Sequence, residues 1–182
     1  MYEKTLKSAR IYEGKIINLR VDTVELPDKK YSKREIVEHS GAAAVVPVTM
    51  NGDVILVKQF RKPVEEVIYE IPAGRLETKE SAEKCALREM AEETGYTAGS
   101  LEKLTDYYTS PGFSNEVIHL YLARDLTEGQ AKPDEDEYLE VIRLPLKEAL
   151  EMIRKGEIQD SKTIIGLMMA AERIAASADV TQ

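Results

Sequence analysis

The sequence predicts an α+β protein in which a domain of residues 41–182 follows a small antiparallel β appendage, residues 1–40. Three observations predict this class. Polar, partly alternating strand segments fill the N-terminal part, apolar strand segments follow on both sides of an Asn-Gly turn, and segments with helical spacing come later. Hydrophobic residues make up 43% of the 182 residues, which is enough for a packed core.

The appendage is expected to contain two strands joined by a short turn. Residues 16–26 partly alternate between apolar and polar, the pattern breaks at Pro27 and Asp28, and residues 31–39 continue as an extended segment. A two-stranded ribbon is not stable by itself in water. The appendage must therefore pack on the rest of the chain or on a second copy of it.

The domain begins with an apolar hairpin. Residues 41–49 are apolar on both faces, as in a buried strand. Asn51-Gly52 is the strongest short turn signal, and residues 53–60 form the returning strand. Further strands are expected at residues 67–71, 101–109, 116–123 and 138–144. The turn between the second and third of these contains Pro and Gly, the usual turn residues.

Three helices are expected, at residues 80–94, 146–155 and 161–177. The first has the clearest ends, because Thr78 or Ser81 can cap its start and Gly95 suits the left-handed position after its end. Its apolar positions fall at helical spacing and can bury one stripe. They are Ala82, Cys85, Ala86 and Met90.

Composition excludes several classes of protein. Acidic residues outnumber basic ones by 33 to 25, and a net charge of −8 argues against a nucleic-acid-binding module. The single cysteine, Cys85, rules out an intramolecular disulfide framework. We find no signal-peptide pattern at the N-terminus and no apolar run long enough to span a membrane, and we therefore expect a cytoplasmic protein.

The first helix carries an unusual acidic face. Glu89, Glu92 and Glu93 fall at positions i, i+3 and i+4, so they share one side of the helix. They lie near its C-terminus, where the helix dipole disfavours negative charge. A bound divalent cation would resolve this conflict, and hard oxygen ligands suit magnesium. The alternative is a solvated, glutamate-rich helix surface.

The wider spacing around these glutamates resembles the Nudix box of the Nudix hydrolases. Its fixed positions are all present, with Met90 at the apolar position after Arg-Glu and Tyr96 where an aliphatic residue is usual. These fixed positions are Gly74, Glu80, Arg88, Glu89, Glu92, Glu93 and Gly95. The resemblance implies a Nudix-type α/β/α sandwich with a mixed β-sheet. It also implies hydrolysis of a nucleoside diphosphate linked to another moiety, with two or three magnesium ions, or manganese, as cofactors.

The resemblance also implies roles for residues of the box. Glu89, Glu92 and Glu93 match metal ligands, with Glu89 and Glu93 as the first choices for direct ligands. The backbone carbonyl of Ala73 matches a further ligand. Arg88 matches one half of a supporting pair, with Glu80, that orients the loop and the helix. We count Arg88 and Glu92 among the catalytic residues. The alternatives are a plain helix-start acid at Glu80 and a surface cation at Arg88.

An acidic loop precedes the strand that begins at Tyr138. A run such as residues 133–137 is usually solvated, but a loop acid that reaches a metal-bound water can serve as a general base. The resemblance assigns the base to Glu135 and an additional metal ligand to Glu137. The two roles can also be exchanged, because the loop is nearly self-similar.

Much of the chain is similar to the ADP-ribose pyrophosphatase branch of this family. The similar segments are residues 33–38, 41–45, 59–61 and 70–74. Pro111, sixteen residues after Gly95, and the neighbouring Gly112 fall where this branch has a substrate-binding turn. The resemblance implies hydrolysis of ADP-ribose to AMP and ribose 5-phosphate. The alternatives are a GDP-sugar, a dinucleotide or a flavin dinucleotide as substrate, and a nucleotide-binding module without turnover.

The same branch implies a homodimer formed through the N-terminal strands. Arg34 and Arg61 would then approach one ADP-ribose from different subunits, and Glu116 matches a contact to the terminal ribose. The aromatic residue that stacks on adenine in some relatives falls near Lys15 and Ile16, and neither is aromatic. The alternative for Arg34 and Arg61 is an ordinary arginine on the surface of a strand.

Overall fold

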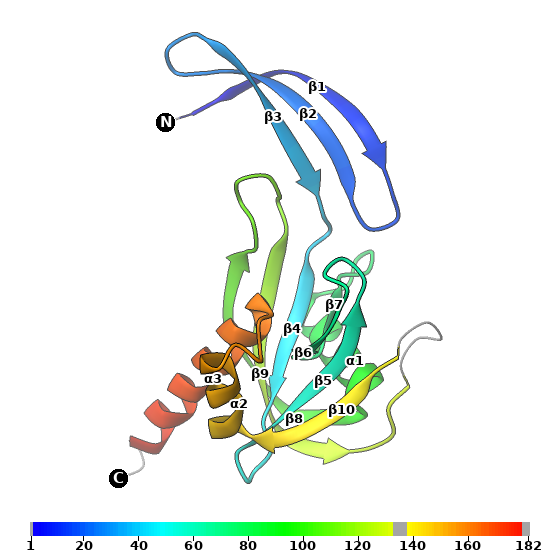
Figure 1. Cartoon of the computed structure of the whole chain (residues 1–182), viewed down its shortest axis with the longest axis vertical. Coiled ribbons are helices and arrows are strands. Elements are labelled where there is room, and N and C mark those ends of the chain that lie inside the picture. Colours follow the sequence, from blue (N-terminus) through cyan, green and yellow to red (C-terminus); the bar gives the residue numbers. More distant parts are fainter. Residues whose placement is uncertain (1, 133–137, 180–182) are drawn as a thin grey trace. The chain divides into compact units, whose positions relative to one another are not determined.

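The computed structural model describes residues 2–132 and 138–179 (Figure 1). The chain forms two compact units. The first unit combines Met1–Gly41 with Tyr107–Val117, and the second combines Ala42–Asp106 with Ile118–Gln182. The segment 107–117 thus lies far from the N-terminal strands in sequence and belongs with them in space.

The first unit is built on a three-stranded antiparallel sheet. Its strands are β1 (Lys4–Glu13), β2 (Asn18–Glu25) and β3 (Tyr31–Glu38), in the order β1-β2-β3. The sequence predicted β2 and β3 and missed β1. All ten residues of β1 are exposed, so the strand has no buried face and gives no alternating signal.

Backbone bonds attach the segment 107–117 to β3. Val37 N–H donates to the carbonyl of Phe113 at 2.7 Å, and Asn115 N–H donates to the carbonyl of Val37 at 3.2 Å. The N–H of His39 donates to the side chain of Asn115 at 2.8 Å. These bonds make the turn after β8 part of the first unit.

Among the described residues, the second unit contains seven strands in two sheets. They are β4 (Ala42–Pro47), β5 (Asp53–Arg61), β6 (Glu66–Glu70), β7 (Ala73–Arg75), β8 (Tyr96–Tyr108), β9 (Val117–Glu128) and β10 (Glu140–Pro145). One sheet has the order β7-β4-β9-β8 and the other β10-β5-β6. Because β4 runs parallel to β9 and antiparallel to β7, the sheet is mixed, as predicted. The predicted turn at Asn51-Gly52 joins β4 to β5, with Gly52 at φ 81°.

Helices cover both faces of β4, which confirms the predicted α/β/α sandwich. Ala43 and Val45 pack into a buried cluster with Met90 of α1 (Ala82–Thr94). Val46 faces the opposite side of the sheet, toward α3 (Ser161–Asp179). Its Cγ2 lies so close to Gly166 of α3 that a Cβ added at this glycine would be 2.8 Å away. Adjacent strand residues face opposite sides of a sheet. α2 (Leu146–Arg154) packs beside α3 and β10.

The strands β7 and β8 differ from the prediction. β7 has three residues and was not predicted, because it is too short for a periodic pattern. β8 begins at Tyr96 rather than near Leu101, through a polar stretch that includes Gly99. The predicted helices agree closely with the observed ones. No helix in the described part of the chain is long and apolar enough to cross a membrane.

Candidate metal and pyrophosphate site

Helix α1 is held firmly at both ends. The Ser81 hydroxyl accepts a hydrogen bond from Lys84 N–H at 3.4 Å, so Ser81 rather than Thr78 is the N-cap. Gly95 follows the helix at φ 79° and donates its N–H to the Ala91 carbonyl at 3.0 Å. A Cβ at Gly95 would lie 2.6 Å from Ala131 N, so only glycine fits this position. The glutamates of α1 therefore stand on a rigid platform.

The predicted apolar stripe of α1 is buried against the sheet. Cys85, Ala86 and Met90 are fully buried. The Cys85 Sγ lies 3.5 Å from the Gly74 carbonyl oxygen, and burial raises the pKa of its thiol to about 12. This cysteine is therefore a core residue that seats the helix on β7, and it is not a nucleophile.

Arg88 ties together three carboxylates. Its Nε and Nη2 bind the two oxygens of Glu80 at 2.9 and 3.0 Å. Its Nη1 donates to Glu89 at 2.7 Å and to Glu92 at 2.9 Å. The hydrogen bonds from Arg88 lower the pKa of Glu80 to about 2, and the same contacts raise the pKa of Arg88. This arrangement fixes the loop before α1 to the middle of the helix.

Glu93 and Glu89 reach the backbone of β7. Glu93 is only 3% exposed, and its Oε2 accepts a hydrogen bond from Ala73 N–H at 3.2 Å. Glu89 lies over Gly74, since a Cβ added there would be 1.8 Å from Oε1 of Glu89. A buried carboxylate is costly unless cations or donors surround it. The two side chains thus present oxygen atoms beside Ala73 and Gly74 of β7.

The donor chemistry of this place fits a divalent cation. Glu89, Glu92 and Glu93 together with the Ala73 carbonyl offer only oxygen atoms, which magnesium prefers. Within residues 2–132 and 138–177, no three His, Cys, Asp or Glu side chains converge closely enough to hold an ion as they stand. Here Arg88 bridges Glu89 and Glu92 and supplies the positive charge between them.

The loop that carries the predicted base leaves from the same end of α1. Lys132 N–H donates to the Glu92 carbonyl at 2.8 Å, and Gly129 and Ala131 lie against Gly95. Glu135 and Glu137 themselves lie outside the described residues. The structure therefore anchors the start of the loop next to the last turn of the glutamate-bearing helix.

Arg61 lies at the end of β5 and binds a buried acid. Its Nε is 2.7 Å from Oε2 of Glu70, and its Nη2 is 3.2 Å from Oε1. The side chain of Arg61 remains 40% exposed, whereas that of Glu70 is 3% exposed. Burial of Arg61 lowers its pKa, but the bonds to Glu70 and the charge of Glu93 outweigh burial and raise it. Arg61 is thus a fixed cation within the electrostatic reach of Glu93.

The remaining predicted substrate residues belong to the first unit. Arg34 forms a two-pronged ion pair with Glu3 on the sheet surface, at 2.6 and 2.9 Å. Pro111 and Gly112 occupy an exposed turn, closed by the bond from Phe113 N–H to the Ser110 carbonyl.

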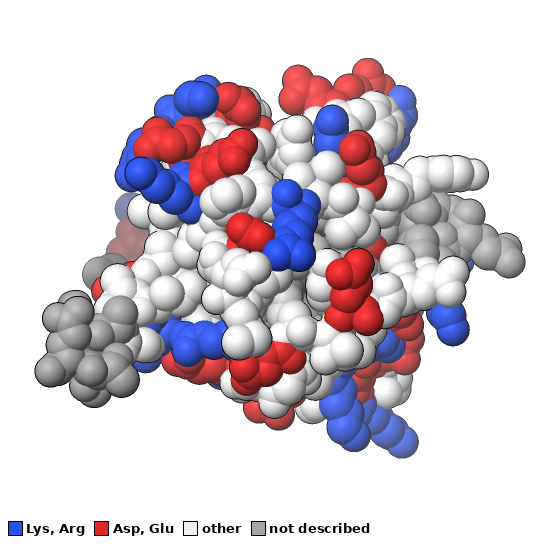
Figure 2. Space-filling view, turned by 90° about the horizontal axis from the view of Figure 1, so that it is seen from below, with Lys and Arg blue, Asp and Glu red and all other residues white. Residues whose placement is uncertain are grey.

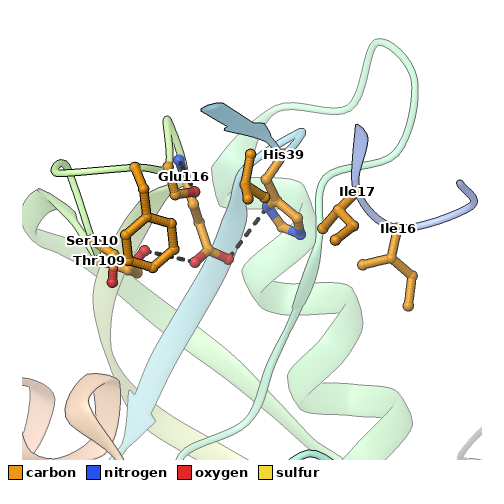
Figure 3. A pocket seen from close by; sticks show the side chains of 9 residues that line it. Ile16, Ile17, His39, Thr109, Ser110 and Glu116 are labelled. Atoms are coloured by element: carbon orange, nitrogen blue, oxygen red, sulfur yellow. Dashed lines mark hydrogen bonds and ion pairs between the residues drawn. The ribbon is translucent and has the colours of Figure 1, made fainter. Parts of the chain in front are cut away.

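Glu116 lies in a pocket of about 320 Å³ in the first unit (Figure 3). Its Oε2 accepts a hydrogen bond from the Thr109 hydroxyl at 2.7 Å, and its Oε1 lies 3.3 Å from His39 Nδ1. Ile16 and Ile17 point into the same pocket from the other side. No pattern in the sequence pointed to His39, because a single histidine between strands has no recognisable spacing.

The face of the molecule shown in Figure 2 carries both acidic and basic side chains. Acidic and basic side chains are interspersed over this face of the molecule rather than gathered by sign. Ion pairs between them are common, as for Arg143 with Asp53 at 2.8 Å and Arg154 with Glu151. Exposed pairs of this kind contribute little to stability.

Comparison with known families identifies the chain. The NUDIX domain model matches residues 38–165, and the model of the nucleoside diphosphate sugar hydrolase N-terminal domain matches residues 3–37. Together with a capped helix that carries the box glutamates against β7, this match shows that the chain belongs to the Nudix family.

Individual relatives agree over most of the chain. It is 53% identical over 163 residues to the ADP-ribose pyrophosphatase of Bacillus subtilis (strain 168), with 88% of each chain covered. It is 49% identical over 167 residues to the methanol dehydrogenase activator of Bacillus methanolicus, with 91% of this chain and 90% of the relative covered. A crystal structure of an ADP compounds hydrolase has a TM-score of 0.86 at 19% identity, covering 97% and 96% of the two chains, which shows the same fold.

Proposed function

We propose that the chain is a cytoplasmic, magnesium-dependent pyrophosphatase that hydrolyses ADP-ribose to AMP and ribose 5-phosphate. The observation that carries this proposal is the placement of Glu89 and Glu93 against the backbone of β7, next to the cation Arg61. The 53% identity to a relative named ADP-ribose pyrophosphatase supports the choice of substrate.

The proposed mechanism assigns a role to each part of the site. Glu89, Glu93, Glu92 and the carbonyl of Ala73 would hold two or three divalent ions. When bound, such ions neutralise the pyrophosphate and make water a better nucleophile. Arg88, fixed by its bonds to Glu80, keeps the helix and the preceding loop in register.

Proton transfer falls to the loop that starts at Lys132. Glu135 would accept the proton of the attacking water, and Glu137 would add a ligand for the ions. Arg61 binds the anionic part of the substrate, because its guanidinium is fixed on Glu70 and still partly exposed. Water attacks a phosphorus atom of the pyrophosphate, and AMP and ribose 5-phosphate leave.

A substrate panel tests this proposal. The purified protein with magnesium should release phosphatase-sensitive product from ADP-ribose faster than from a GDP-sugar, a dinucleotide or a flavin dinucleotide. EDTA should abolish turnover while the circular dichroism spectrum stays unchanged, since the core is formed by apolar side chains. Faster hydrolysis of one of the other compounds would mean that this compound, and not ADP-ribose, is the preferred substrate. No turnover on any of them would favour a nucleotide-binding module, and full activity in EDTA would contradict the metal mechanism.

We further propose a homodimer formed through the first unit. Every residue of β1 is exposed, and this includes Leu6, Ile11 and Tyr12, which are 48%, 59% and 57% exposed. Apolar side chains on an otherwise uncovered strand favour association with another chain. A second copy of this chain would cover β1 and bring its Arg34 to the substrate in the neighbouring site.

Two measurements test the dimer. Light scattering at micromolar concentration should give the mass of a dimer, about twice 20.5 kDa. Arg34→Ala and Glu93→Gln variants should each be weak, but refolding them together should restore activity in one site of each mixed dimer. A monomeric mass, or the absence of complementation, would refute the shared site.

Gly74→Ala should reduce turnover roughly 10²-fold with little loss of stability. The added methyl group would overlap Glu89, whose flexible end can move aside and so leave its ligand position. Gly156→Ala is the control, because it meets no atom within 4 Å but has φ 75°. It should lower the melting temperature and leave turnover unchanged. If Gly74→Ala keeps full activity, Glu89 is not a ligand.

A further inference from the structure

A charged cluster at the start of α3 is the feature that the proposed mechanism leaves unused. It consists of Asp160, Lys162 and Thr163, together with Glu70 and Ile71 at the end of β6. We propose that Lys162 is a positioning residue that acts through Glu70 on Arg61 and thereby sets how strongly Arg61 binds the anionic substrate. The inference rests on the proposed function, in which Arg61 contacts that substrate.

Lys162 and Arg61 share one carboxylate. Oε1 of Glu70 accepts a hydrogen bond from Lys162 Nζ and another, at 3.2 Å, from Arg61 Nη2. Oε2 of Glu70 receives Arg61 Nε at 2.7 Å. Lys162 is 15% exposed and Glu70 is 3% exposed, so solvent screens this part of the cluster weakly.

The charge state of Glu70 depends on both cations. Burial by itself would raise the pKa of Glu70, but the ammonium of Lys162 and then the guanidinium of Arg61 outweigh burial and lower it. Glu70 is therefore ionised, and its negative charge is divided between two partners. Without Lys162, the buried charge of Glu70 would depend mainly on Arg61, because a buried charge without a partner is costly.

The start of α3 is itself fixed in place. Asp160 Oδ2 accepts hydrogen bonds from the N–H and the hydroxyl of Thr163 at 2.9 and 2.6 Å, and its Oδ1 lies 3.1 Å from Lys162 Nζ. The hydroxyl oxygen of Thr163 in turn accepts a hydrogen bond from Ile71 N–H at 2.8 Å. Lys162 thus projects from a capped helix start that is bonded to the residue after Glu70.

Lys162 affects how well a phosphate group of the substrate can compete with Glu70 for Arg61. Arg61 uses Nε and Nη2 on Glu70, and its exposed part remains accessible to a ligand. As long as Lys162 neutralises part of Glu70, a phosphate group competes with a weakened carboxylate for Arg61. Without Lys162, Arg61 alone must neutralise Glu70, so the phosphate competes less well.

Steady-state kinetics with ADP-ribose test this inference. Lys162→Met should raise KM roughly tenfold and change kcat less than about threefold, because a binding contact is weakened and the chemistry is untouched. Lys162→Arg should recover most of the loss. Lys155→Met, on an exposed lysine after α2, is the control and should change neither parameter.

A double-mutant cycle separates action through Arg61 from direct action on the substrate. The variant Arg61→Met/Lys162→Met should have the KM of Arg61→Met alone within about twofold. If the two substitutions raise KM additively, Lys162 acts on the substrate directly and not through Arg61. If Lys162→Met leaves KM unchanged, Lys162 has only a structural role. Either result overturns the inference. If Lys162→Met does not fold, Lys162→Gln serves instead, since it keeps a hydrogen-bond donor for Glu70, removes the positive charge and should raise KM in the same way.

A measurement without turnover keeps this inference separate from the proposed function. The Nε–H resonance of Arg61, assigned by its loss in Arg61→Met, should shift in Lys162→Met and keep its position in Lys155→Met. If the wild-type protein hydrolyses none of the substrates, the proposed function fails and this resonance still tests the coupling. An unmoved resonance would overturn the coupling whatever the enzyme hydrolyses.

Discussion

Replacing Glu93 by glutamine should lower turnover roughly 10³-fold or more. The change keeps the volume of a buried side chain and its helix propensity. The amide oxygen of glutamine can still accept the hydrogen bond from Ala73 N–H, so the contact to β7 survives. Only the negative charge is removed, at the place where the ions are proposed to bind. Steady-state turnover with ADP-ribose at saturating magnesium measures the effect.

The control for Glu93→Gln lies on the same helix. Glu83 is exposed in the first turn of α1, so Glu83→Gln removes the same charge away from β7 and should keep normal turnover. Both variants should show the thermal stability of the wild type within a few degrees. Normal activity in Glu93→Gln would exclude this glutamate from the metal site.

Glu135→Gln should lower turnover roughly 10²- to 10⁴-fold, with substrate affinity little changed. A general base acts at one step, so its loss slows the chemistry without weakening the binding of the substrate. Glu137→Gln should behave instead as a weakened ion site and recover part of its activity when magnesium is raised. Magnesium titrations of kcat for the two variants give the comparison, because added metal refills a weak site but does not replace a missing base.

Neighbouring acids of the same loop serve as controls for that comparison. Asp134→Asn and Asp136→Asn should cost little if these side chains are only solvated charge. Rescue of Glu135→Gln but not of Glu137→Gln by magnesium would exchange the two roles. If neither substitution matters, the base lies elsewhere, and Glu92 on α1 becomes the first candidate.

The sequence predicted those parts of the fold whose signal is local. The ends of α1 follow from Ser81 and Gly95, because capping and left-handed backbone depend on single residue types. The buried strand β4 follows from an unbroken apolar run. The box spacing placed Glu89 and Glu93 on one helix face, and the structure added that this face meets Ala73 and Gly74.

The features that could not be predicted from the sequence depend on contacts between distant residues, or on a strand whose residues are all exposed. The pairing of Lys162 with Glu70 joins positions 92 residues apart, and neither residue belongs to a periodic motif that links them. The pairing of Arg34 with Glu3 spans 31 residues and depends on β1, a strand with no buried face. The joining of residues 107–117 to the N-terminal strands is likewise a tertiary event.

Direct ion binding tests most directly whether the glutamates of α1 hold divalent cations beside β7. Manganese can be titrated into the purified protein and followed by electron paramagnetic resonance, without any substrate. We expect tight binding in the wild type and in Glu83→Gln, and the loss of at least one ion, or a weakening of its binding by more than about tenfold, in Glu89→Gln and in Glu93→Gln. Binding curves for Glu89→Gln and Glu93→Gln that coincide with that of the wild type would contradict this assignment of the metal site.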